Sequence, residues 1–257
     1  MRAPVSVAYS VDYTRAAFTL FHEKGNIITA EMVDALRAGL ESIAGNPTLK
    51  LITLEGAGAD FSFGASIPEH APERIAHVLP AMHRLIEDLL DAPAVTAAIV
   101  RGRCLGGGFE LALACDFIFA AEDATFGLPE ISLGVFPPAA SALLPLRVGS
   151  ARATRAIITG ETVAAAAWRD AGLVDFVAAS ERLDEEVDRW FAGQLQTKSA
   201  AALRHAAAAA RMELSSRVRE SLPVLERLYL NDLMRTHDAV EGVDAFLAHR
   251  PPAWRNR

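Results

Sequence analysis

Cysteine is scarce in this 257-residue chain, and its scarcity limits the chemistry that the chain can support. The two cysteines, Cys104 and Cys115, lie in apolar surroundings, and neither belongs to a CxxC pair or to a cysteine–histidine cluster. Disulfide scaffolds and structural zinc sites need such groupings. We therefore expect reduced thiols and no metal site, as is usual in the cytoplasm.

The chain also lacks a long apolar run and an excess of positive charge. No uninterrupted apolar segment reaches the roughly 18 residues of a membrane span. The formal net charge is -7, from 25 Lys and Arg against 32 Asp and Glu, whereas a general nucleic-acid or anionic-membrane binder needs a basic face. The sequence predicts a cytoplasmic protein that binds neither nucleic acid nor membrane, and its 51% hydrophobic residues suffice for a sizeable core.

Strand-like and helix-like segments alternate in the first 182 residues. Segments rich in alternating or β-branched residues are predicted strands, at 5–10, 15–21, 49–56, 94–102 and 116–122. The segments 29–45 and 73–90 have the apolar spacing of helices, and Pro80 is expected to kink or divide the second one. This alternation predicts an α/β fold.

Strand signals stop near residue 183. From there the chain is predicted to form three or four amphipathic helices, one of them rich in alanine, the best helix former. We expect residues 1–182 to form the α/β core that carries the site, and residues 183–257 to form a helical C-terminal region.

The segment CLGGGFELALACDF, residues 104–117, places one ionisable side chain, Glu110, in an otherwise apolar stretch. Glycines 106–108 are expected between a strand that ends near Arg103 and a helix that begins near Phe109. They could form only a tight turn that lets the helix pack closely, or they could leave backbone N–H groups free to bind negative charge. If this helix is buried, desolvation raises the pKa of Glu110 and suits it to proton transfer near neutral pH.

A second isolated acid, Glu130, follows Pro129 in another apolar stretch that contains glycine and proline. Such a residue is usually a helix-start acid, but two acids beside glycines are better candidates for an acid/base pair. The segment 58–70 carries apolar side chains that are unusual in a solvated loop, and its Gly64–Ala65 backbone could supply an N–H donor. Two N–H groups from separate loops, aimed at one oxygen, would form an oxyanion hole.

Together these segments resemble the enoyl-CoA hydratase/isomerase, or crotonase, superfamily. The resemblance rests on DFSFGASI, RGRCLGGGFELALACDFIFAAEDATFGLPEISLG and AAWRDAGLVDFV, in that order, and extends from Val5 to Arg250. It implies a crotonase-like spiral of ββα units followed by a helical trimerisation region, assembled as a homotrimer or a dimer of trimers. It also implies an acyl-CoA thioester substrate, with coenzyme A as part of the substrate and no separate cofactor.

The resemblance assigns roles to individual residues. It places the thioester oxygen between the backbone N–H groups of Ala65 and Gly107, and it makes Glu110 and Glu130 the pair that holds the attacking water and moves protons. Retention of both acids favours a hydratase. The residues assigned to the substrate and CoA are Lys24, Phe63, Ile67, Phe136, Pro138, Phe246 and His249.

Three departures from the family pattern concern the substrate. Ser66 stands where many members have an aspartate, and His249 stands where a lysine often meets the CoA phosphates. The run VFPPAAS replaces a glycine-rich run, so Pro138 lacks the N–H that a glycine would carry, and the wall there should be bulkier and more rigid.

The FSFGAS loop and the GVFPP run are similar to those of cyclohexa-1,5-dienecarbonyl-CoA hydratases of anaerobic aromatic degradation, so a cyclic substrate is expected. A straight-chain enoyl-CoA hydratase is the alternative, and an isomerase or thioester hydrolase of the same fold remains open. The acidic balance and the two retained acids argue against a non-catalytic or RNA-binding relative.

Overall fold

The computed structural model describes residues 2–257, and its central element is a six-stranded sheet. In spatial order the strands are β1 (Val5–Tyr9), β2 (Arg15–Leu20), β3 (Leu51–Gly56), β4 (Val95–Val100), β6 (Phe117–Ala121) and β9 (Phe176–Ala178). β1 is antiparallel to β2, and the other neighbours are parallel. Every residue of β4 is buried, which explains why its sequence VTAAIV lacks a regular polar–apolar alternation.

A second sheet joins three short strands, β5 (Arg103–Leu105), β7 (Thr125–Gly127) and β8 (Thr162–Ala164). The chain passes from the large sheet to the small one in successive turns, from β4 to β5 and α3 (Gly107–Ala114), then from β6 to β7 and α4 (Pro138–Val148). An isolated β-bridge between Ser62 and Cys104 places the segment that follows β3 beside β5. This segment therefore corresponds, in an earlier turn of the spiral, to the short strands β5 and β7. This succession confirms the predicted α/β spiral of ββα units.

Helices form most of the remaining structure. They are α1 (Ala30–Ile43), α2 (Pro72–Leu90), α5 (Ser150–Thr159), α6 (Ala165–Asp170), α7 (Leu183–Gln194), α8 (Ala200–Arg227) and α9 (His237–Leu247). Short 3₁₀ turns lie at η1 (Ile67–His70), η2 (Pro129–Leu133), η3 (Ser180–Arg182) and η5 (Leu233–Arg235), and a π-helical turn lies at η4 (Leu228–Asp232). Among residues 2–257, none of the helices has the length and apolar character to cross a membrane.

Two details differ from the sequence-based expectation. Pro80 lies inside α2 and does not divide it, because α2 packs against both α1 and α8 and this tertiary contact outweighs the lost helical hydrogen bond. Helix α3 begins at Gly107, two residues earlier than expected. Gly106 precedes it with φ of 49°, a left-handed conformation that glycine adopts without strain.

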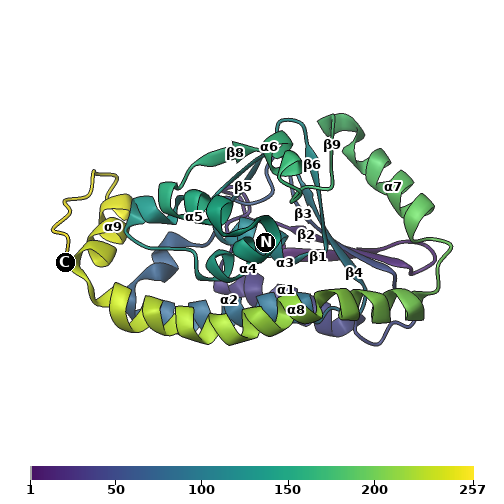
Figure 1. Cartoon of the computed structure of the whole chain (residues 1–257), viewed down its shortest axis with the longest axis horizontal. Coiled ribbons are helices and arrows are strands. Elements are labelled where there is room, and N and C mark those ends of the chain that lie inside the picture. Colours follow the sequence, from purple (N-terminus) through teal and green to yellow (C-terminus); the bar gives the residue numbers. More distant parts are fainter. Residues whose placement is uncertain (1) are drawn as a thin grey trace.

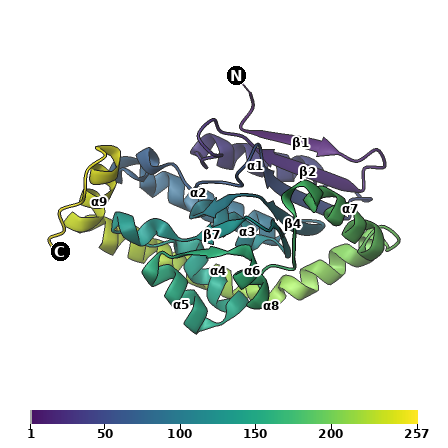
Figure 2. The same ribbon diagram turned by 90° about the horizontal axis from the view of Figure 1, so that it is seen from above.

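The C-terminal helices extend along the length of the molecule. Both views show α8 along one side, from the neighbourhood of α7 to α9 at the opposite end (Figures 1 and 2). Residues of α7 and α8, among them Val187, Ala207 and Val218, belong to the main hydrophobic core. The helical C-terminal region is therefore confirmed. The boundary at residue 182 and the trimeric or hexameric assembly stay predictions.

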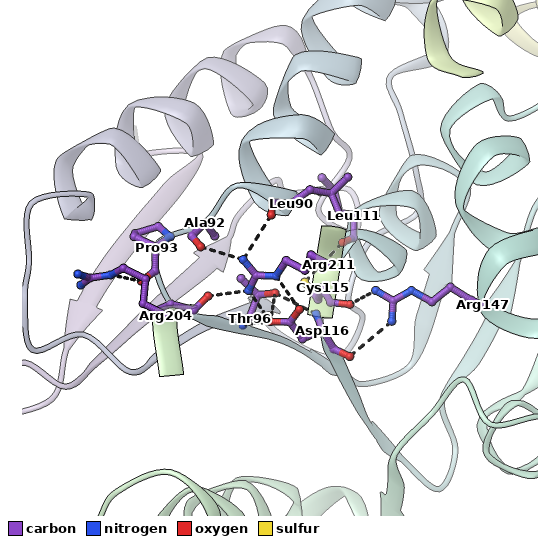
Figure 3. A network of polar contacts seen from close by, with 11 residues as sticks. Leu90, Ala92, Pro93, Thr96, Leu111, Cys115, Asp116, Arg147, Arg204 and Arg211 are labelled. Atoms are coloured by element: carbon purple, nitrogen blue, oxygen red, sulfur yellow. Dashed lines mark hydrogen bonds and ion pairs between the residues drawn. The ribbon is translucent and has the colours of Figure 1, made fainter. Parts of the chain in front are cut away.

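A buried ion pair fixes α8 to the core. Arg211, which is 4% exposed, donates through Nε to Oδ1 of Asp116 at 2.7 Å and through Nη2 to Oδ2 (Figure 3). The remaining guanidinium hydrogens reach the carbonyls of Ala92 at 2.8 Å and Ala94 at 2.6 Å, which lie between α2 and β4. The backbone N–H of Thr96 donates to Asp116 at 2.8 Å, so this one carboxylate joins α8 to β4 and to the start of β6.

Candidate active site

A small pocket of about 50 Å³ lies where α3, η2, α4, α2 and η4 meet. It is lined by six of the residues that the sequence singles out, Ala65, Gly107, Glu110, Glu130, Phe136 and Pro138. Apolar side chains of α2, such as Leu79 and Met82, form the opposite wall. This volume is sufficient for a water molecule, which needs at least about 10–15 Å³ by this measure.

Glu110 enters the pocket from the first turn of α3, all of whose residues are buried. Its side chain is 6% exposed, and Oε1 accepts a hydrogen bond from the Ala140 N–H at 2.9 Å. Burial raises the pKa of Glu110 to about 7, against the opposing effect of the Ala140 and Ala139 N–H groups at the start of α4. Those two donors favour the ionised form of the Glu110 carboxylate.

Glu130 lies in η2 and approaches the glycine run from the other side. A Cβ at Gly106 would lie 2.6 Å from its Oε1, so only glycine leaves room for this carboxylate. Its Oε2 is buried without a hydrogen-bond partner among the described residues. Burial, and then the charge of Glu110, raise the pKa of Glu130 to about 8. At neutral pH the pair therefore favours an ionised Glu110 beside a protonated Glu130, one base and one acid.

Two backbone N–H groups face the same pocket. Ile28 forms a parallel bridge that uses the Gly64 carbonyl and the Ser66 N–H, each at 2.9 Å, so the Ala65 N–H between them points the other way. A Cβ at Gly107 would lie 3.4 Å from Ala65 N, which places the two backbone segments side by side. Within residues 2–257 neither the Ala65 N–H nor the Gly107 N–H donates to a protein acceptor. Both are available to one ligand oxygen.

Phe136 and Pro138 form part of the pocket wall at the start of α4. Pro138 is the first residue of α4, a position where a proline costs little because that N–H would have no helical partner. The Phe136 ring lies edge-on to Tyr229, with 5.4 Å between ring centroids. The expected rigid, apolar wall thus consists of a proline pair supported by an aromatic pair.

The structure does not bring the other five predicted ligands to this pocket. Phe63 packs against Gly25 and beneath Arg103, whose guanidinium carbon lies 4.1 Å from the ring centroid. The remaining four do not line the pocket either: Ile67 is half-buried, and Lys24, Phe246 and His249 are exposed. Their contacts with the substrate stay predictions.

Sequence reasoning missed two polar side chains that line the pocket, His70 and Tyr229. His70 ends η1, and its Nδ1 lies 2.9 Å from the Ser66 carbonyl. Tyr229 comes from η4, near the end of the chain, and is 1% exposed. The SIPEH segment is a visible departure that could have drawn attention to His70. No local pattern marks Tyr229, which lies in an ordinary helical segment.

Within residues 2–257 no group of three or more His, Cys, Asp and Glu side chains is arranged to hold a metal ion. Both cysteines are buried and unbridged. The groups that line the pocket and can donate or accept protons or hydrogen bonds are its carboxylates, backbone N–H groups, His70 and Tyr229.

Comparison with known proteins matches this fold and site to one family. The enoyl-CoA hydratase/isomerase family model matches residues 17–257. The chain is 42% identical to the cyclohexa-1,5-dienecarbonyl-CoA hydratase of Thauera aromatica, over 99% of this chain and 98% of that protein. It is 31% identical to a probable enoyl-CoA hydratase of Bacillus subtilis, over 97% and 98%.

Comparison with a solved structure supports the same family. The crystal structure of an enoyl-CoA hydratase from Mycobacterium avium subsp. paratuberculosis superposes with a TM-score of 0.87 at 28% identity, covering 99% of both chains. The chain therefore belongs to the enoyl-CoA hydratase/isomerase family, and it is an enzyme of the enoyl-CoA hydratase type.

Proposed function

We propose that this enzyme hydrates a cyclic α,β-unsaturated acyl-CoA of the cyclohexa-1,5-diene-1-carbonyl-CoA class in the Glu110–Glu130 pocket. The observation that carries the proposal is the convergence of two buried carboxylates of unequal acidity on one pocket, beside two available N–H groups. The 42% identity to a hydratase named for that cyclic substrate supports the ring as the acyl group.

The reaction follows from the proton states of the two acids. Ionised Glu110 takes a proton from water while the water oxygen bonds to the β-carbon. The π electrons of the double bond move toward the thioester and form an enolate, whose oxygen charge the Ala65 and Gly107 N–H groups stabilise. Glu130 then gives its proton to the α-carbon. The sum is the addition of one water, and a proton exchange between the acids and solvent restores the starting state.

The residues 136–138 support a cyclic rather than a linear acyl group. Proline fixes φ, so a wall made of Pro137 and Pro138 cannot adapt to many chain shapes. A flat ring held against such a wall keeps its β-carbon near the nucleophile, whereas a flexible chain has many non-productive conformations. The same wall would give a straight-chain substrate less of this advantage.

A straight-chain enoyl-CoA hydratase is the second candidate, because the identity of 31% to a probable enoyl-CoA hydratase extends over 97% of this chain. Both candidates use the same acids and the same N–H groups. They differ only in which acyl group the pocket wall favours.

The test compares cyclohexa-1,5-dienecarbonyl-CoA with crotonyl-CoA, using purified protein and mass spectrometry to follow the gain of one water. A higher kcat/KM for the cyclic substrate is expected. A higher value for crotonyl-CoA would support the straight-chain alternative. If neither thioester gains water, and a shifted double bond or free CoA appears instead, the hydratase assignment itself is wrong.

A further inference from the structure

Tyr229 brings a phenol into the pocket from the far end of the chain. Helix α8 ends at Arg227, and the π-helical turn η4 that follows carries Tyr229. Such single π turns often occur at functional sites. The ring is 1% exposed and belongs to a separate hydrophobic cluster that also contains Leu79 and Val135. Its hydroxyl is buried and has no hydrogen-bond partner among the described residues.

A buried hydroxyl without a hydrogen-bond partner destabilises the fold, and a second polar atom of the same pocket is in the same state. Oε2 of Glu130 lines the same pocket and is also buried without a partner. Buried polar atoms are normally paired, so two unpaired atoms facing one cavity suggest that a ligand completes them. A ligand oxygen that both accepts and donates hydrogen bonds would suit both atoms.

Hydrogen-bond donors are scarce on the side of the pocket where Tyr229 lies. Pro137 and Pro138 have no N–H, and the Ala140 N–H already donates to Glu110. His70 contributes no donor either. The Ser66 carbonyl can only accept, so Nδ1 of His70 carries the hydrogen, and burial lowers the pKa of His70 and keeps the ring neutral. Its Nε2 is then an acceptor.

The other hydrogen-bond and proton donors of the pocket bind or react with other atoms of the substrate. On the proposed function, the Ala65 and Gly107 N–H groups bind the thioester oxygen, and the proton of Glu130 goes to the α-carbon. Among the pocket-lining side chains, Tyr229 is left as the donor that loses no proton during the reaction. Burial and the charges of Glu130 and Glu110 raise the pKa of Tyr229, so the phenol stays protonated throughout.

We infer that Tyr229 is a positioning residue of the hydratase, whose phenol O–H donates a hydrogen bond to the oxygen of the attacking water. This inference rests on the proposed function. Water has two hydrogens and two lone pairs. Glu110 accepts one hydrogen, Tyr229 occupies one lone pair, and the second lone pair is directed at the β-carbon. The same donor then meets the hydroxyl oxygen of the product. No bond of Tyr229 is broken at any step.

The test is Tyr229→Phe, which keeps the ring against Phe136 and removes only the hydroxyl. The expected result is a fall in kcat for hydration of about tenfold to a hundredfold, because a water molecule that loses this hydrogen bond is held less often in the productive orientation. KM for the acyl-CoA should change less than about twofold, because the phenol does not touch the thioester. Tyr9→Phe, which removes an exposed phenol on β1, is the matched control and should leave both constants unchanged.

A second readout separates positioning of water from support of the pocket. A saturated thioester, cyclohexanecarbonyl-CoA in D₂O, can lose its α-hydrogen to the ionised form of Glu130 and regain a deuterium from it, with the enolate oxygen held by the two N–H groups and without any attacking water. Tyr229→Phe should retain the wild-type exchange rate while hydration falls. Loss of both reactions would mean that Tyr229 only supports the fold of the pocket, and full retention of hydration would mean that its hydroxyl has no role. Either result overturns the inference.

Failure of the proposed function can be distinguished from failure of the inference about Tyr229. It fails if the wild-type enzyme does not hydrate the cyclic thioester, whatever the variant does. If the wild type hydrates crotonyl-CoA instead, the same comparison of Tyr229→Phe with Tyr9→Phe is made on that substrate.

Discussion

The molecule contains two buried polar clusters that differ in whether their polar atoms have hydrogen-bond partners. In the Asp116 cluster, both carboxylate oxygens and every guanidinium nitrogen of Arg211 have a partner (Figure 3). In the pocket that holds Glu110 and Glu130, one carboxylate oxygen and the Tyr229 hydroxyl have no hydrogen-bond partner within the part of the chain that the structure describes. Both clusters are buried in the same chain, so solvent access does not explain the difference.

The difference separates a structural role from a chemical one. Charges that are fully paired hold elements together, and Arg211 fixes α8 to the segment between α2 and β4. Polar atoms left without partners destabilise the fold, and at a functional site a substrate or transition state can satisfy them. Helix α8 links the two clusters, because Arg211 anchors it and η4 at its end delivers Tyr229.

The largest expected effect comes from breaking the paired cluster. Arg211→Met leaves the Asp116 carboxylate, whose side chain is 17% exposed, without its guanidinium, and removing one partner of such a largely buried ion pair costs about 3 kcal/mol. The free energy of unfolding, measured by urea denaturation, should fall by that amount. Arg217→Met, on an exposed arginine of the same helix, is the control and should cause no measurable change. Equal stability of the two variants would show that the Asp116 cluster does not anchor α8.

Substitution of Glu110 or Glu130 in the pocket should lower activity without lowering stability. Glu130→Gln or Glu110→Gln preserves shape but removes the titrating group, so hydration should fall by at least ~10². The free energy of unfolding should not fall, because an amide is cheaper to bury than a carboxylate. Glu122→Gln, an exposed acid between β6 and β7, serves as the control. Near-normal turnover in both pocket variants would rule out the acid/base pair.

The parts of this site that local sequence fixes were predictable, and the parts that tertiary packing fixes were not. Glu110 and Gly107 lie in one short helix, and the spacing of glycines around Ala65 and Glu130 matches a family, so their convergence in one pocket could be anticipated. Tyr229 reaches the pocket only because α8 runs the length of the molecule (Figure 1). The sequence around Tyr229 does not indicate where that helix ends, so the position of Tyr229 in the pocket could not be predicted.

Two prolines show that local sequence does not decide their effect on the fold. Pro80 was expected to kink or divide the helix, and the structure shows one undivided helix from Pro72 to Leu90 that packs against α1 and α8. Pro138 was expected to remove a backbone N–H; it is the first residue of α4, and the Ala140 N–H that follows it donates to Glu110. In both cases neighbours distant in sequence decide what a proline does.

The pH dependence of hydration provides a smaller test of the unpaired cluster. Activity needs an ionised Glu110 and a protonated Glu130, whose pKa values are raised to about 7 and about 8. A plot of kcat/KM against pH should rise as pH passes through about 7 and fall beyond about 8, with a change of about tenfold per pH unit outside this window. A flat profile from pH 5 to 9, at roughly constant ionic strength, would contradict the assignment of these acids.

The same shifts have a defined effect on stability. Because folding raises both pKa values above the usual 4.5, the folded protein binds protons more tightly than the unfolded chain. The contribution of this pair to stability is present below pH 4.5 and is lost as pH rises toward about 8. Glu130→Gln should therefore lose less stability than wild type over that interval, as urea denaturation at a series of pH values would show.

The smallest expected effect concerns the pocket wall, where Pro138→Gly restores an N–H and adds flexibility at the start of α4. A rigid wall favours a flat ring over a flexible chain, so the substitution should lower kcat/KM for the cyclic dienoyl-CoA several-fold more than for crotonyl-CoA. The ratio of the two values cancels any general loss of folded enzyme. Pro145→Gly, at a proline of the same helix that does not line the pocket, should leave the ratio unchanged. If Pro138→Gly also leaves it unchanged, the wall does not select the ring, and the preference must come from the apolar side chains of α2 instead.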